Sequence, residues 1–163
     1  MGFKVQLKQI GSSAKIQQGV RLLTAREVLA GVPANTAPRK GDPINNATLL
    51  YIHDQGSPAR GIPQREVLRP GIRDAKVEIV ARLQQGARLA LNGDKVGVEK
   101  ALTAAGLIAQ KSIRQKINTG PFTPLKPATL AARRRRGRTG TKPLIDTGAL
   151  RQAINFVVVD KKK

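Results

Sequence analysis

The sequence predicts an α+β fold in which a small antiparallel sheet packs against two long helices, with long loops or arms between them. Apolar residues recur every three or four positions over 72–91 and 98–117, which is the period of an amphipathic helix. Short stretches near 3–10, 26–33 and 153–160 are typical of strands. At 163 residues the chain corresponds to a single domain.

The first part of the chain is predicted to form a strand, a helix and a second strand. Residues 2–10 alternate apolar and polar side chains from Phe3 onward, as a strand with one buried face does. A helix is expected over 14–23, and a second strand is expected over 26–33. A loop rich in proline, glycine and basic residues follows over 34–42.

A short helix is expected over 47–54, because this stretch is mostly apolar and follows good N-cap residues, Asn45 and Asn46. Gly56 can take a positive φ and Pro58 cannot continue the helical hydrogen bonds, so the helix should stop before them.

An extended arm is predicted next. Pro63 and Pro70 bracket residues 64–69, and each proline biases the residue before it toward extended geometry. Prolines also remove hydrogen-bond donors that a core strand needs, so we expect 56–69 to be an interface arm. The arginines of this arm suit carboxylates on a neighbouring subunit. The predicted arm residues are Arg60, Pro63, Arg65 and Arg69.

The long helix over 72–91 should begin near Pro70, since proline suits a first helical position. Asn92-Gly93-Asp94 should break it, and the second long helix should follow over 98–117. Four prolines and several basic residues then occupy 121–143. We expect this basic segment to be a long, partly disordered loop with a helical turn at 128–134.

A structural cap is predicted at Asp146-Thr147-Gly148. Asp146 or Thr147 can accept hydrogen bonds from the first N–H groups of a short helix over 149–153, and Gly148 allows a tight entry. The β-branched stretch 154–159 then forms the last strand.

Three patterns occur in order along the chain: Y-I-H-D-x-G-S from Tyr51, I-P-Q-R-x-x-L-R-P-G-I from Ile62, and L-I-D-T-G-A-L-R-x-A-I from Leu144. Together they resemble the tail-completion, or minor tail, proteins of long-tailed phages, over about residues 25–160. The resemblance implies a single tail-completion-like domain over 1–163 and a structural virion protein, made in the host cytoplasm, that completes the tail top in the neck.

The resemblance also implies partners. A protein of this family would form a homo-oligomeric ring, a hexamer if it follows the symmetry of the tail tube. The ring would meet the head–tail connector and the tail terminator or tube proteins. Aromatic residues make up 2% of the chain, so its core must consist of Leu, Ile, Val and Ala. We expect neighbouring subunits to add to such a modest core.

Nothing in the sequence indicates an enzyme or a cofactor. The chain has no cysteine and one histidine, which excludes disulfides, thiolate metal sites and multi-histidine sites. It contains no nucleotide-binding glycine motif. His53, Asp54 and Ser57 lie too close together in sequence to favour triad geometry over a polar helix end. No run of 18 apolar residues occurs, so we expect no membrane partner.

The charge predicts an anionic partner. Thirty Lys and Arg against ten Asp and Glu give a formal net charge of +20. The candidate contacts are Arg133, Arg134, Arg135 and Arg136, which would meet packaged DNA or an acidic protein ring. A solvated or locally ordered loop is the other interpretation of this run. The alternative function is a basic nucleic-acid-binding protein of nucleoid- or ribosome-associated type.

Overall fold

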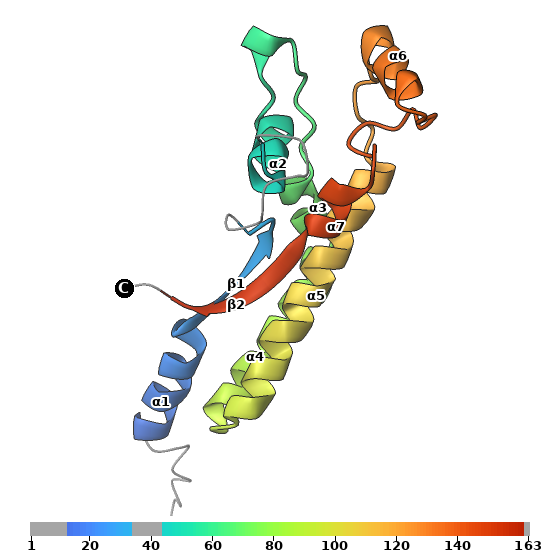
Figure 1. Ribbon diagram of the computed structural model, residues 1–163. Coiled ribbons are helices and arrows are strands. Elements are labelled where there is room, and N and C mark those ends of the chain that lie inside the picture. The colour runs from blue at the N-terminus through green and yellow to red at the C-terminus, as the bar shows by residue number, and fades with distance from the viewer. Residues whose placement is uncertain (1–12, 34–43, 162–163) are drawn as a thin grey trace, which may run out of the picture.

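The structure, a computed structural model, describes residues 13–33 and 44–161 (Figure 1). The predicted strand over 2–10 and the loop over 34–42 lie outside these residues. The elements run in this order: α1 (Ser13–Thr24), β1 (Arg26–Gly31), α2 (Asn46–Gln55), the 3-10 turn η1 (Pro58–Arg60), α3 (Leu68–Asp74), α4 (Lys76–Leu91), α5 (Lys95–Thr119), α6 (Pro127–Arg135), α7 (Ala149–Ala153) and β2 (Asn155–Asp160).

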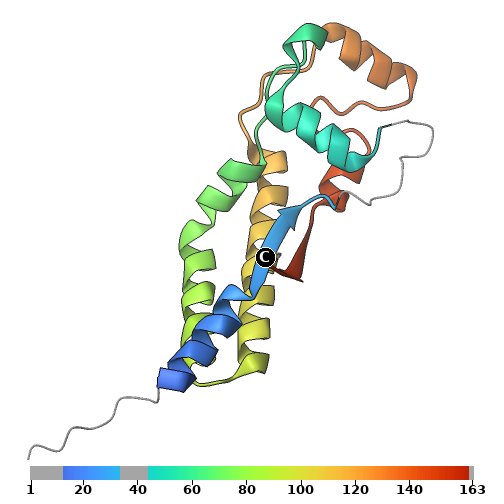
Figure 2. The same ribbon diagram turned by 90° about the vertical axis from the view of Figure 1, so that its left-hand side faces the viewer.

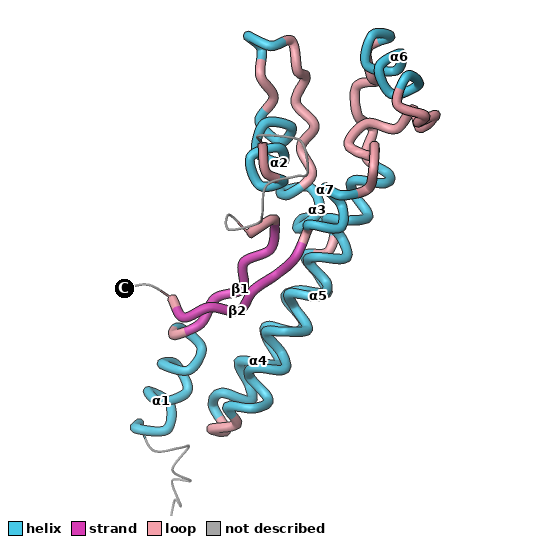
Figure 3. Tube along the Cα trace, in the orientation of Figure 1, coloured by secondary structure: helices cyan, strands magenta, loops and turns pink. Residues whose placement is uncertain are grey.

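The α+β class is confirmed. Within the described residues, β1 and β2 form a two-stranded antiparallel sheet in which Arg26 is opposite Asp160 and Gly31 is opposite Asn155. Both strands pack against α5, and helices make up most of the chain (Figure 3). Phe156 of β2 lies directly over Gly106 of α5, where a Cβ atom would come within 2.1 Å of its ring. The absence of a side chain at Gly106 therefore lets the strand approach the helix closely.

Helices α4 and α5 form a long antiparallel hairpin, and α1 packs on the lower half of α4 (Figure 2). The predicted break between the long helices is confirmed, because Gly93 has a φ of 77° and ends α4. The carboxylate of Asp94 accepts a hydrogen bond of 2.8 Å from the Gly97 N–H and so caps α5.

The first long helix differs from the prediction at its start. Instead of one helix from Pro70, α3 begins at Leu68 and is separated from α4 at Ala75. Arg69 therefore lies in a helix, so its placement in an extended arm was wrong. The reason is an acceptor distant in sequence: the Asp54 carboxylate binds the N–H groups that open α3. Pro70 is tolerated there because the first turn of a helix does not need its N–H.

Two apolar clusters make up the core. The lower cluster joins the sheet to the hairpin through Ala90, Val98 and Leu102, with Val28 and Val158 packed against them. The upper cluster connects the short helices α2 and α7 to the upper end of α5. Its members are Leu50, Val67, Ile113, Ile117, Leu144, Leu150 and Ile154.

Candidate functional site

A strongly basic region lies beyond α2 and α7, at the upper end of the molecule in Figures 1 and 2. It consists of the hairpin loop 56–66 and the segment 120–148, and we call it the basic lobe. The segment 120–148 alone carries seven Lys and Arg against one acidic residue, Asp146. The sequence predicted contact residues in both parts, and the structure brings the two parts together.

The hairpin loop is closed by its own backbone. Ser57 and Ile62 exchange hydrogen bonds of 2.9 and 3.0 Å, and η1 lies between them. Gly56 and Gly61 have φ values of 76° and 60°, in the left-handed region where glycine is favoured. A Cβ atom on Gly61 would lie 2.8 Å from the Nζ atom of Lys126, so the tip of the loop rests against the segment 120–148.

Arg65 fastens the hairpin loop to the rest of the lobe. Its guanidinium group donates to the Thr123 carbonyl from both Nε and Nη2, at 3.3 and 3.0 Å. Its own N–H donates to the His53 carbonyl at 2.7 Å. The residue is only 5% exposed, so it is not the interface contact that the sequence predicted. Burial and the nearby charge of Arg133 lower the pKa of Arg65 below its usual value.

Arg133 has a similar internal role. The two hydrogens of its Nη1 atom are shared among the carbonyls of Gly140, Lys142 and Ile145, at 2.9, 3.0 and 2.9 Å. Its Nε atom lies 3.5 Å from the Asp146 carboxylate, and the residue is 6% exposed. Arg133 therefore closes the loop that follows α6, and its assignment as a contact for an anionic partner was wrong. Five-donor guanidinium groups suit such multiple bonds to carbonyls.

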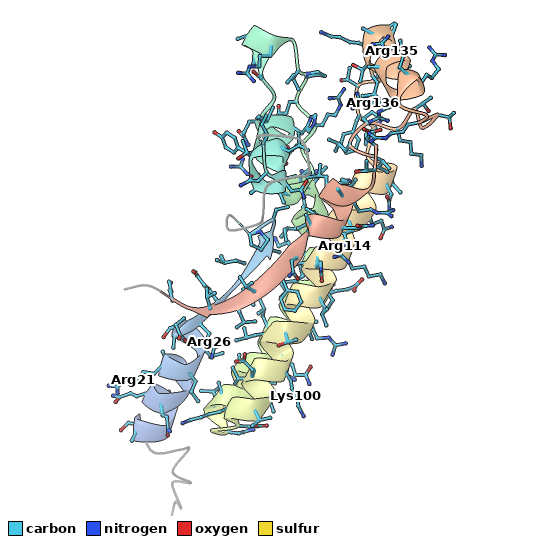
Figure 4. All side chains as sticks on the ribbon, viewed as in Figure 1. Arg21, Arg26, Lys100, Arg114, Arg135 and Arg136 are labelled. Carbon is cyan, nitrogen blue, oxygen red and sulfur yellow. The ribbon has the colours of Figure 1, made fainter. Side chains whose placement is uncertain are left out.

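The other arginines of the run face solvent. Arg134, Arg135 and Arg136 are exposed, and the Nε atom of Arg136 donates to the Ala132 carbonyl one turn earlier in α6. Figure 4 shows the side chains of Arg135 and Arg136 at the surface of this end. The segment is also more ordered than predicted, since α6 has nine residues in place of a single turn. The exposed cations of the lobe are Arg60, Lys126, Arg134, Arg135, Arg136 and Lys142.

The predicted cap at 146–148 is arranged differently from the expectation. The Asp146 carboxylate pairs with Arg133 and Arg138, and it does not accept from α7. Thr147 Oγ1 accepts from the Ala149 N–H at 3.3 Å, and Gly148, with a φ of 81°, is the residue at which α7 begins. Asp146 was therefore wrongly placed as a cap, because two arginines from the other side of the loop compete for its carboxylate.

Pro63 is half-buried in the returning strand of the hairpin loop, and Arg60 is exposed at the end of η1. Of the four predicted arm residues, Arg60 in the lobe and Arg69 on α3 are exposed.

Sequence reasoning missed the central role of Asp54. Its Oδ1 atom accepts from the N–H groups of Val67 and Leu68 at 2.9 and 3.2 Å, and the side chain is buried. The neighbouring His53 is also partly buried. Burial first, and the Arg65 charge second, lower the pKa of His53 below its usual 6.5. A polar residue at the end of a helix just before a loop was the only signal for this role.

The described part of the lobe presents exposed cations on a folded backbone. Over the residues that the structure describes, no group of three or more His, Cys, Asp or Glu could hold a metal ion. In the same part of the chain, no helix has both the length and the apolar character that crossing a bilayer requires. Binding of a negatively charged partner is the chemistry that the exposed guanidinium and ammonium groups can perform.

The chain was compared with models of protein families, with curated proteins and with solved structures, and none of them matches it.

Proposed function

We propose that this chain is a structural protein of a long-tailed phage, which completes the top of the tail and joins it to the head as one subunit of a ring in the neck. In this proposal the ring is a hexamer, and it lies between the head–tail connector and the tail terminator or tube. The basic lobe meets an anionic surface of one of these neighbours.

The observation that carries the proposal is the meeting of the two segments that resemble tail-completion proteins. The first segment, 46–72, supplies Leu50 and Val67 to the upper cluster, and the second, 144–159, supplies Leu144, Leu150 and Ile154. More than 70 residues separate the segments in the sequence. The two segments therefore belong to one structural unit, as a single tail-completion-like domain requires.

The basic lobe supports a role in assembly. Its exposed cations lie at one end of an elongated molecule, where a stacked neighbour could reach them (Figures 1 and 4). We favour an acidic protein rim over DNA as the partner. Arginine forks bind carboxylates in two-point geometry, whereas a tail lumen lined with arginine would hold DNA phosphates and retard ejection.

The test is an experiment on particles. Deletion of the gene should leave filled heads and separate tails, and a tagged copy should restore joined particles with the tag at the tail top in negative-stain images. A copy with Arg134, Arg135 and Arg136 all replaced by Gln should fold but fail to join heads to tails. Arg88→Gln, which changes an exposed arginine far from the lobe, is the matched control. Normal particles from the deletion would contradict the proposal.

The second candidate is a nucleic-acid-binding protein, and the exposed arginines of α6 favour it. Phosphate binding by such residues is strongly salt-dependent, with a slope of about −0.9 in log K against log salt for each phosphate contacted on duplex DNA. If the free chain binds duplex DNA, replacing Arg134, Arg135 and Arg136 by Gln should remove roughly three phosphate contacts. The slope of log K against log salt should become correspondingly less steep. Salt-dependent binding that these changes remove, together with normal particle assembly, would establish this function in place of the first.

A further inference from the structure

A polar pocket lies where α7 packs beside the end of α5, and we call it the α5–α7 pocket. Its volume is about 380 Å³. Two residues of α5, Arg114 and Asn118, and two residues of α7, Arg151 and Gln152, line it. Figure 4 labels Arg114 on α5 beside α7. Among the described residues, the lining thus presents two guanidinium groups and two amide groups, and no carboxylate.

Both guanidinium groups are held by neutral acceptors. Arg114 Nη2 donates to the carbonyls of Gln152 and Ile154 at 3.3 and 2.8 Å, which caps the end of α7. Arg151 Nη1 donates to the Asn118 Oδ1 atom at 3.0 Å, across the contact between the two helices. Both arginine side chains are half-buried. The two charges are therefore positioned before a ligand arrives, which lowers the entropy cost of binding.

The charges of the pocket have no counter-charge in the described part of the chain. Two other arginines that are shielded from solvent do have one: Arg26 pairs with Glu99 and Asp160, and Arg133 pairs with Asp146. In the α5–α7 pocket, two positive charges line one space and neither pairs with a carboxylate. Like charges repel and partial burial weakens their hydration, so an anion in the pocket would offset both costs.

Hydrogen-bond donors of the pocket also remain for a ligand. The bonds of Arg114 to described residues all come from Nη2, which leaves Nη1. Those of Arg151 come from Nη1, which leaves Nη2 and Nε. Asn118 accepts through Oδ1, so its Nδ2 group can still donate. The pocket can thus offer donors from two cations and from an amide to several oxygens at once.

The number of charges and donors selects a phosphate monoester over other anions. A carboxylate has one charge and two oxygens, which one guanidinium group can satisfy alone. A phosphate monoester has a charge of about −1.5 to −2 at pH 7 and three acceptor oxygens. It can therefore neutralise both arginines and accept from the amides as well. A phosphate diester, as in DNA, has a single charge and one fewer terminal oxygen.

We propose that the α5–α7 pocket binds the phosphate group of a small phosphate monoester, with Arg114 and Arg151 as its two charge partners. Asn118 and Gln152 donate from their amide groups to the remaining oxygens. The exposed cations of the basic lobe make no contact with this ligand. The inference does not rest on a role in a phage neck.

The probe is methyl phosphate, and dimethyl phosphate is the matched control ligand because it has a single charge. Binding to the full-length protein is measured by titration calorimetry at constant ionic strength. Methyl phosphate should bind, and dimethyl phosphate should bind at least about tenfold more weakly, because it loses a charge-assisted hydrogen bond.

Variants place the ligand in the pocket. Arg151→Gln should weaken methyl phosphate binding by about tenfold or more, since it removes hydrogen bonds to a charged group. Gln152→Glu should weaken it as much, because it puts a carboxylate into the pocket, and the exposed side chain of Gln152 makes this change compatible with folding. The triple variant with Gln in place of Arg134, Arg135 and Arg136 should bind methyl phosphate as the wild type does.

Three results would overturn the inference. The first is no binding of methyl phosphate to the wild type, and the second is equal binding of the two ligands. The third is binding that survives both pocket variants, or that only the triple variant removes, since the phosphate would then lie on the basic lobe. Normal particles from the gene deletion, with methyl phosphate binding as described, would contradict only the proposed function.

Discussion

Asp54 and Leu68 are joined by a hydrogen bond of 3.2 Å from the Leu68 N–H to the Asp54 Oδ1 atom, across the hairpin loop. The same oxygen accepts from the buried Val67 at 2.9 Å. One carboxylate at the end of α2 thus satisfies the first N–H groups of α3, and a negative charge there also favours the positive end of the helix dipole. The loop between the two helices is thereby fixed at its base.

Asp54→Ala should destabilise the protein by about 1–3 kcal/mol, because it leaves the N–H of fully buried Val67 without an acceptor. Asp54→Asn keeps one oxygen and should cost less. The measurement is the free energy of unfolding from urea denaturation. Equal stability of the Ala variant and the wild type would show that water replaces the carboxylate and that the cap is dispensable.

Arg133 and Arg135, two residues apart on α6, should behave in opposite ways. Arg133→Met removes three hydrogen bonds to the following loop and should lower the free energy of unfolding by about 1–3 kcal/mol. Hydrogen exchange should also become faster over 137–146. Arg135→Met changes an exposed side chain, so its effect on stability should stay within about 0.5 kcal/mol. Equal hydrogen-exchange rates over 137–146 in the two variants would contradict the separate roles of Arg133 and Arg135.

Stability should fall as the pH drops below about 7, because protonation of His53 in α2 favours the unfolded chain. The pKa of His53 is lowered in the folded protein, so below its ordinary value of 6.5 the unfolded chain binds the proton more readily. The stabilisation is therefore complete above pH 6.5 and is lost as the pH falls toward the lower folded pKa. Melting temperatures between pH 8 and pH 5 should decline less in His53→Gln than in the wild type. Parallel curves would mean that another group controls the dependence.

Gly106→Ala should be destabilising because its methyl group would overlap the Phe156 ring, 2.1 Å from the nearest ring atom. Forcing β2 away from α5 is an overpacking change, with a cost of about 1–3 kcal/mol. Gly140→Ala is the control, since nothing lies within 4 Å of its new methyl group and its φ is not positive. Thermal melting of the two variants gives the comparison, and equal melting temperatures would show that Phe156 can move aside at no cost.

Local signals in the sequence were sufficient for most helices and strands. The period of 98–117 predicted α5, Asn92-Gly93-Asp94 predicted the break before it, and the β-branched run 154–159 predicted β2. Asn45 was also predicted as a cap, and it accepts from the Thr48 N–H at 2.8 Å. These features depend on residues within a few positions of one another, which a sequence displays directly.

The contacts of the basic lobe could not be predicted in the same way. Arg65 binds a carbonyl 58 residues away, and Asp54 caps a helix 14 residues away, so neither pairing leaves a local pattern. Arg133 looks identical to Arg134, Arg135 and Arg136 in the sequence. Its burial depends on which face of α6 turns toward the returning loop, and a run of identical residues has no periodicity to show that face.

The closed loop after α6 has a consequence for selectivity. A disordered basic tail loses conformational entropy whenever it docks, and it can adapt to almost any acidic surface. Here α6 holds the backbone that carries Arg134 and Arg135, and the Arg133 hydrogen bonds tie the following loop to this helix. Less backbone ordering would then oppose association with a partner. An acidic partner would meet these arginines at the spacing of a helix, so we expect partners of equal total charge to bind with different affinities.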